Sequence, residues 1–211
     1  MKTLIAEGAE AKIFRDGDLV IKERISKIYR LKELDDKIRK YRTRREISIL
    51  EKASKLINVP KLNKDSSEKT FKVIMEFIDG KKLAEHLDLF NDGKRIQICK
   101  NIGKEIALMH NSNIVHGDLT TSNMLLKDDK VYLIDFGLSF IDEKVEHKAV
   151  DLHLLRQALE SKHYKNYETS FKSVLDGYKE NSNNYKDIID RLDKVECRGR
   201  YKSKNKKVAF G

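Results

Sequence analysis

Apolar and polar positions alternate along the first part of the chain in the manner of β-strands. The segment LIAEGAEAKIFRDGDLVIKERI has two such runs on either side of DGD, a turn signal, and this pattern predicts a hairpin with room for a third strand at its end. The run TFKVIMEFI at 70–78 predicts another strand that stops before the turn DGKK. Strands therefore dominate the N-terminal part.

Helical periodicity takes over further along the chain. Residues 34–55 and 94–111 carry apolar side chains at near-helical intervals. The first set includes Leu34, Ile38, Tyr41, Ile47 and Leu50, and the second includes Ile96, Cys99, Ile102, Ile106 and Met109. Two short strands, NMLL and VYLID, come next, and helical patterns return at 149–160, 165–179 and 184–195. A strand-rich half followed by a helical half predicts an α+β fold.

Composition is that of a soluble globular chain with a heavily charged surface. The 211 residues suffice for one domain or for two small lobes that share a cleft. We find no apolar run long enough to cross a bilayer and no secretory stretch at the start, so we expect a cytoplasmic location and no membrane contact. Cys99 and Cys197 lack metal-ligand spacing and are expected to be reduced thiols. The net charge of +10 favours an anionic partner.

The polar run IVHGDLTTSN at 114–123 suggests phosphoryl transfer chemistry. Such transfer needs metal ions on the phosphate oxygens and a carboxylate that orients the nucleophile. Asp118 and Asn123 have the spacing of a kinase catalytic loop, in which the aspartate orients the nucleophile's proton and the asparagine binds magnesium. Asp135 of IDFG, at the end of a predicted strand, supplies a second magnesium ligand. Each motif alone could arise by chance, and their joint occurrence in this order is specific.

With these motifs the chain resembles the protein kinase superfamily over nearly its whole length. Of the glycine-rich loop pattern only Gly8 is present, in AEGAEAKI. The strand VIK resembles the V-A-I-K motif, and the resemblance implies that Lys22 contacts the α- and β-phosphates of ATP. Glu46 is the best candidate for the helix glutamate that orients Lys22, with Glu33 and Glu51 as rivals.

Two further segments fit the kinase pattern. MEFI resembles the hinge, which would place Met75 at the back of the adenine pocket and let the backbones of Glu76 and Ile78 bind the base. Asp151 in KAVDL would support the catalytic loop from a helix in the core. An ordinary core strand and an ordinary acid at a helix N-terminus are the simpler alternatives for these segments.

Departures from the kinase pattern indicate a minimal member. Gly117 replaces the arginine of H-R-D, so an arginine that pairs with a phosphorylated activation loop is missing. Pro60 is the only proline, which rules out an A-P-E motif and a full peptide platform. We therefore expect a minimal bilobal kinase-like fold, with an N-lobe at 1–78, a reduced C-lobe at 79–197 and a basic tail at 198–211.

Finer matches point to one family. The segments YRLKELDDKIRKYRTRRE, HGDLTTSNML, DFGLSF, KAVDLHLL and RGRYKSK closely resemble the small kinase subunit of the KEOPS complex, called PRPK in animals. That resemblance implies ATPase and serine/threonine autokinase activity with ATP and magnesium as cofactors. It also implies work beside the threonylcarbamoyl-transferase subunit and the other KEOPS subunits, which modify adenosine in transfer RNA.

Basic residues gather in two segments. Residues 23–45 hold ten Lys or Arg against four acids, and residues 198–211 hold six against none. Arg198, Arg200 and Lys202 are candidates for contacts with transfer RNA phosphates, in a tail that we expect to be mobile on its own. Solvated charges without a partner explain both segments equally well.

Two other functions remain open at this stage. Small-molecule phosphotransferases of the aminoglycoside or choline kinase type also carry HGDL and a downstream Asn, but they usually have a larger helical lobe. A non-catalytic kinase-like scaffold that binds RNA or protein would be expected to have lost Lys22, Asp118 or Asp135, and all three are present.

Overall fold

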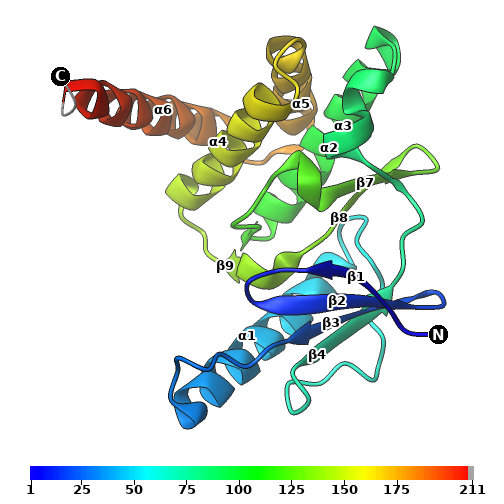
Figure 1. Ribbon diagram of the computed structural model, residues 1–211. Helices are drawn as coiled ribbons and strands as arrows, with labels where there is room; N and C mark the ends of the chain where they lie inside the picture. Colours follow the sequence, from blue (N-terminus) through cyan, green and yellow to red (C-terminus); the bar gives the residue numbers. More distant parts are fainter. Residues whose placement is uncertain (209–211) are drawn as a thin grey trace.

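The computed structural model describes the backbone of residues 1–208 and the side chains of residues 1–197. Its N-terminal half is a four-stranded antiparallel sheet in the order β1-β2-β3-β4, accompanied by one long helix (Figure 1). The elements are β1 (Thr3–Glu7), β2 (Ala11–Asp16), β3 (Leu19–Arg24), α1 (Lys32–Ala53) and β4 (Lys72–Glu76). The predicted hairpin around DGD is confirmed as β2 and β3, and the third strand, β1, lies before this hairpin and not at its end, where it was expected.

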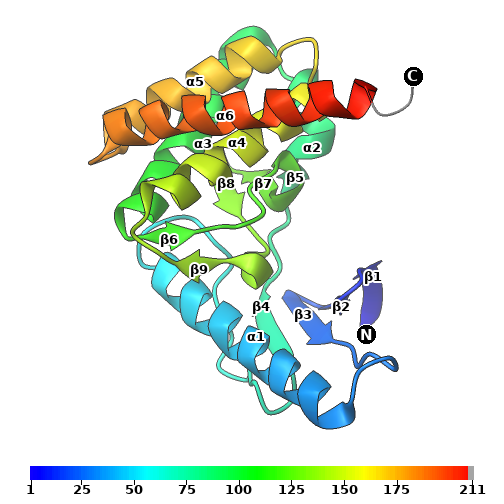
Figure 2. The ribbon, with the colours of Figure 1, turned by 90° about the vertical axis from the view of Figure 1, so that its left-hand side faces the viewer.

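The second half is mainly helical, and Figure 2 shows it stacked above the sheet and α1. Its first elements are β5 (Lys81–Lys82), α2 (Leu83–His86), η1 (Leu87–Leu89), α3 (Asp92–Asn111), β6 (Ile114–Val115), η2 (Thr121–Asn123), β7 (Met124–Lys127) and β8 (Lys130–Leu133). Then come η3 (Phe136–Leu138), β9 (Phe140–Ile141), α4 (Val145–Lys162), α5 (Tyr167–Asn181) and α6 (Tyr185–Val208). Strands β5, β7 and β8 form one small sheet, and β6 pairs with β9. The predicted α+β class with a strand-rich first half is confirmed.

Helix α1 buries a face different from the one that its apolar residues predict. Leu34 and Tyr41, expected to point inward, are 50% and 62% exposed. The buried positions are Asp35, Thr43, Glu46, Ile49, Leu50 and Ala53. Much of the inward face is therefore polar, because its acids pair with cations there, and only the last turns pack into the apolar core. In α3, likewise, Ile96 is 40% exposed and Ile98 is buried instead.

Helices α3 and α5 cross with their backbones in contact. A Cβ atom on Gly103 would lie 2.0 Å from the carbonyl oxygen of Val174, and one on Gly177 would lie 2.1 Å from that of Lys100. No side chain fits at either position, so each glycine is required by its neighbour on the facing helix. This crossing supports the part of the helical half that carries the loop 114–123.

The last helix is longer than the sequence pattern predicts. The pattern favours a helix over 184–195, and α6 continues to Val208. Lysine and arginine are good helix formers, so the basic residues beyond 197 are compatible with this continuation. The side chains of Arg198, Arg200 and Lys202 lie outside the described part of the structure, as do residues 209–211 entirely. Within the described residues, no helix has the length and apolar character needed to cross a membrane.

Replacing Gly103 by alanine tests the close crossing. The added methyl group would overlap the α5 backbone, and we expect the free energy of unfolding to fall by about 3 kcal/mol. Chemical denaturation of the wild type and the variant measures this loss. Gly93 lies in the same helix, where a Cβ would be 3.7 Å from the nearest atom, so Gly93→Ala should change the free energy by less than about 1 kcal/mol. Equal effects at both positions would contradict the crossing.

Candidate active site

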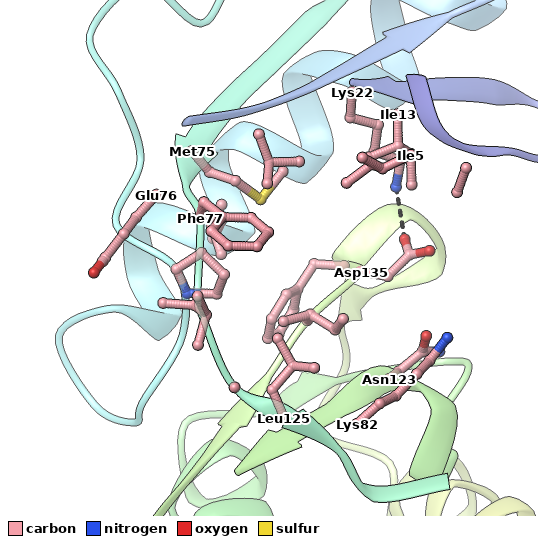
Figure 3. Close-up of a pocket in the computed structure, with 18 of the residues that line it drawn as sticks. Ile5, Ile13, Lys22, Met75, Glu76, Phe77, Lys82, Asn123, Leu125 and Asp135 are labelled. Carbon is pink, nitrogen blue, oxygen red and sulfur yellow. Dashed lines mark hydrogen bonds and ion pairs between the residues drawn. The ribbon is translucent and has the colours of Figure 1, made fainter. Parts of the chain in front are cut away.

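A cavity of about 390 Å³ lies between the two halves of the molecule (Figure 3). Apolar side chains from the sheet and from β7 line much of it, including Ile5, Ile13, Val20, Met75 and Leu125. Seven residues that the sequence assigned to the site reach it: Lys22, Glu46, Met75, Glu76, Ile78, Asn123 and Asp135. The cavity therefore joins a mainly apolar wall, suited to a flat base, to a charged end, suited to phosphates.

The segment after β4 forms one edge of the cavity. Met75 pairs with Val20 of β3, which places both residues in the apolar wall. The Phe77 amide donates to the carbonyl oxygen of Asp18 at 2.8 Å, so this amide is committed to the β2–β3 turn. Its neighbours Glu76 and Ile78 also line the cavity.

Three charged side chains meet at the charged end. Lys22 Nζ lies 2.7 Å from Glu46 Oε1 and 2.6 Å from Asp135 Oδ1. Burial alone would lower the pKa of Lys22, but Glu46 and Asp135 outweigh it and the pKa is raised. Burial would raise the pKa of Asp135, and Lys22 outweighs that effect and lowers it. Both groups are therefore charged at neutral pH.

The geometry favours Glu46 over Glu33 and Glu51 as the helix glutamate that pairs with Lys22. Glu33 and Glu51 are exposed on α1, whereas Glu46 is 2% exposed. Its second oxygen, Oε2, accepts from Arg24 Nη2 at 2.6 Å. Sequence reasoning missed Arg24, although the signal was present: residues two apart on a strand face the same side, so Arg24 follows Lys22 toward α1.

The loop 114–123 brings Asp118 and Asn123 together. Asn123 Nδ2 donates to the backbone oxygen of Asp118 at 2.8 Å and to its carboxylate Oδ2 at 2.9 Å. Because the amide nitrogen is used in this way, the amide oxygen is the atom available to a metal. Asp135 stands at the N-terminus of η3 in the left-handed conformation, with φ of 63°, and its carboxylate accepts from the Gly137 amide.

Asp151 supports this loop from helix α4, as the sequence predicts. It is fully buried, and its two oxygens accept from the backbone amides of His116 at 2.6 Å and Gly117 at 2.9 Å. His110 Nε2 lies 3.2 Å from the same carboxylate, and His110 Nδ1 lies 2.9 Å from the hydroxyl of Tyr178. These two residues, which sequence reasoning also missed, connect the loop to α3 and α5.

Gly117 has a steric reason for replacing the H-R-D arginine. Its φ is +79°, and a Cβ there would lie 2.7 Å from the backbone oxygen of Leu138. Two side chains fill the space around the loop: the buried His116, whose Nε2 lies 3.1 Å from the oxygen of Ile134, and Ser139, whose hydroxyl donates to the oxygen of His116. Burial lowers the pKa of His116, which keeps its ring neutral at neutral pH.

Gly8 lies in the roof of a neighbouring cavity of about 350 Å³ that also contains Asp118. Lys22 and Asp135 line both cavities, so the two spaces meet at the charged end. The loop around Gly8 is tied to α1 by an ion pair of 2.6 Å between Glu10 and Arg42. A nucleophile that approaches Asp118 would enter from this side.

The donor atoms at the charged end suit magnesium. Among the described residues there is no cluster of three or more His, Cys, Asp or Glu side chains that could hold a metal by itself. Asn123 and Asp135 offer one amide and one carboxylate at the cavity. Magnesium is commonly held by one or two protein oxygens together with phosphates and water, so this pair fits a metal that arrives with a nucleotide.

A model of the RIO domain matches residues 9–153. The chain belongs to the RIO domain family. The matched residues include all the charged and polar site residues described above, whereas Ile5, Gly8 and the supporting Tyr178 lie outside the match. RIO domains are kinase-like and bind ATP with a divalent metal, which agrees with the donor set described here.

Relatives that match nearly the whole chain give a more specific family than the RIO domain. The chain is 42% identical to the KEOPS complex subunit Bud32 of Pyrococcus abyssi, with 96% of this chain and 97% of that protein covered. It is 40% identical to the EKC/KEOPS complex subunit bud32 of Dictyostelium discoideum, with 99% and 84% covered. A third relative, the probable bifunctional tRNA threonylcarbamoyladenosine biosynthesis protein of Methanobrevibacter smithii, is 39% identical, with 94% of this chain but only 36% of that protein covered. The resemblance to KEOPS kinase subunits is thereby confirmed.

Glu46 should matter more for folding than Lys22. Glu46→Gln would place two buried cations beside a neutral amide, and we expect the free energy of unfolding to fall by about 3 kcal/mol. Lys22→Met leaves Glu46 paired with Arg24 and should cost less than about half as much. Denaturant titration of both variants without nucleotide measures the difference. If Lys22→Met were the more damaging change, Arg24 would not be neutralising Glu46.

Proposed function

We propose that this chain is an atypical serine/threonine kinase and ATPase that acts within a KEOPS complex in the threonylcarbamoyl modification of transfer RNA. The observation that carries the proposal is the charged end of the inter-lobe cavity. Lys22, Glu46, Asn123 and Asp135 meet there, and Asp118 lies in the adjoining space. This is the set of groups that phosphoryl transfer from ATP requires.

Each residue has a separable role. Lys22 would bind the inner phosphates, and Glu46 holds it while Arg24 shares the charge of Glu46. Asn123 and Asp135 would bind magnesium, which neutralises charge on the phosphates when it is present. Asp118 would orient the attacking hydroxyl or water, because its carboxylate lies beside Asn123 Nδ2 and borders the space next to the phosphate site.

The hinge residues would select the base. Met75 would back the adenine, and the backbone groups of Glu76 and Ile78 would supply an acceptor and a donor to its edge. Their support is the position of all three in the cavity lining, where Figure 3 shows Met75 and Glu76 on the side opposite Asp135. The structure favours this reading over a plain core strand, because the three residues border an open space.

The names of the relatives suggest the partners. Two are KEOPS complex subunits, and the bifunctional relatives combine a region like this chain with further sequence in a protein for threonylcarbamoyladenosine biosynthesis. A fused region usually acts beside the other part of its chain, so the partner we propose is the threonylcarbamoyl-transferase subunit, with other KEOPS subunits and transfer RNA. A stand-alone phosphotransferase for small molecules is a weaker explanation of those names.

Variants of the two aspartates test the chemistry. Asp135→Ala should abolish magnesium-dependent ATP turnover, because one metal ligand is lost and Lys22 loses a partner. Asp118→Asn should lower turnover about a hundredfold with little change in ATP affinity, since it removes the group that orients the nucleophile. Glu51→Gln, an exposed acid on α1, is the matched control. Wild-type turnover in Asp135→Ala would refute the assignment.

The basic C-terminal residues should contribute to RNA binding. Changing Arg198, Arg200 and Lys202 together to glutamine should flatten the slope of log affinity against log salt by roughly 2 to 3, because each phosphate contact adds about 0.9. Transfer RNA binding measured across a salt series gives the slopes. Glutamine at the exposed Lys172, Lys179 and Lys186 controls for net charge. Equal slopes in the two triple variants would mean that these tail cations have no specific contact with RNA.

A further inference from the structure

Three segments distant in sequence meet on the side of the catalytic loop away from the nucleotide cavity. His163 follows helix α4 and is 2% exposed. Its Nδ1 lies 2.7 Å from the carboxylate Oδ2 of Asp88 in η1, and its Nε2 lies 3.3 Å from the hydroxyl of Thr121. Thr121 is fully buried and stands in η2, between Asp118 and Asn123.

The direction of these hydrogen bonds follows from the charge on Asp88. Partial burial would raise the pKa of Asp88, but hydrogen bonds from Asn166 and His163 outweigh it and lower the pKa. Asn166 Nδ2 donates to the other carboxylate oxygen at 3.0 Å. An ionised carboxylate only accepts, so His163 carries a proton on Nδ1, and in the neutral ring its Nε2 accepts from the Thr121 hydroxyl.

An acid, a histidine and a hydroxyl in this order also form the arrangement of a nucleophilic triad. A nucleophile has to reach its substrate, and Thr121 is 0% exposed, so that function is excluded. Burial instead makes the hydrogen bond between Thr121 and His163 important for the structure of the loop. A buried hydroxyl that loses its partner is costly, so the hydrogen bond from Thr121 to His163 favours this position of Thr121, although at 3.3 Å it is longer than the 2.7 Å bond between His163 and Asp88.

The turn that contains Thr121 has few other supports. η2 has only three residues and no side-chain hydrogen bond at its N-terminus. The backbone amide of Asn123 donates to the oxygen of Thr120, and the backbone oxygen of Asn123 accepts from the Ile134 amide. Its last residue is Asn123, the proposed magnesium ligand. A displacement of Thr121 would therefore move the amide oxygen of Asn123, and with it the Asp118 carboxylate that Asn123 contacts.

We propose that His163, oriented by Asp88, is a positioning residue for the reaction: through the Thr121 hydroxyl it sets the place of Asn123 at the metal end of the site. It touches neither nucleotide nor metal. Asp151 holds the beginning of the loop at His116 and Gly117, and His163 holds its end, so the loop is supported at both sides of Asp118. This inference rests on the proposed ATP chemistry of the same site.

The test removes the hydrogen bond between Thr121 and His163 and keeps the side chains close to their original shape. Thr121→Val deletes the hydroxyl, and His163→Asn keeps a donor toward Asp88 but cannot reach Thr121. We expect either change to lower kcat for ATP hydrolysis about tenfold to a hundredfold, since small displacements of catalytic groups have effects of this size. The magnesium concentration for half-maximal turnover should rise, while ADP affinity without metal stays within about twofold. Thr121→Ser retains the hydroxyl and should restore both values.

Two further measurements separate positioning from simple stabilisation. Ser173→Ala removes another buried hydroxyl, whose hydrogen bond stays within α5, and should leave the magnesium requirement unchanged even if the melting temperature falls. The double variant Thr121→Val/His163→Asn should lose no more activity than the worse single variant, because both break one interaction. A wild-type magnesium requirement in Thr121→Val, measured well below its melting temperature, would overturn the inference.

An activity-independent measurement distinguishes failure of this inference from failure of the proposed function. The ¹⁵N shifts of the His163 ring should show the Nδ1-protonated form with a hydrogen-bonded Nε2 in the wild type, and Thr121→Val should change the Nε2 shift alone. A wild type that turns over no ATP but shows this signature would refute the proposed function only. An Nε2-protonated ring in the wild type would refute the inference, whatever the activity.

Discussion

The site depends on one buried interaction, the double ion pair of the Glu46 carboxylate. Burying an anion is costly unless it is paired, and Glu46 is paired twice, with Lys22 and with Arg24, at a position that is 2% exposed. The pairs join α1 to β3, and Lys22 extends the chain of charges to Asp135 in the other half of the molecule. One buried charge thus aligns the sheet, the long helix and the metal end of the cavity, and it explains why α1 turns a polar face inward.

Beneath the cavity, hydrogen bonds from buried side chains hold the loop 114–123 in place. Asp151 holds the catalytic loop through backbone amides, and His110 and Tyr178 extend that support into α3 and α5. Ser139 donates its hydroxyl to the oxygen of His116 and is fully buried, so it is placed as part of this support rather than as a site of control by phosphorylation. Gly117 lets the loop pass close to Leu138, where a side chain would not fit.

Motif spacing picked out polar residues that line two adjoining cavities, because Lys22, Asp118, Asn123 and Asp135 belong to segments whose local geometry is set by short-range sequence. The strand and helix order was also predictable from periodicity. The residues that were missed act across long sequence separations: Arg24 pairs with Glu46, Tyr178 with His110, and His163 with both Asp88 and Thr121. A contact between segments that are distant in sequence produces no periodic pattern along the chain. The predicted inward face of α1 was wrong for the same reason, since an apolar pattern does not show which acidic side chains will pair with buried cations.

The backbone crossing of α3 and α5 has a mechanical consequence. Helices separated by side chains can slide past one another by small rotamer changes, whereas Gly103 and Gly177 leave no such layer between these two. The floor of the site should therefore move as one piece. We expect opening or closing of the cavity to come from the sheet, and the Glu10–Arg42 pair ties the loop around Gly8 to α1. A partner that binds α1 would then shift the loop around Gly8, which forms the roof, from outside the site.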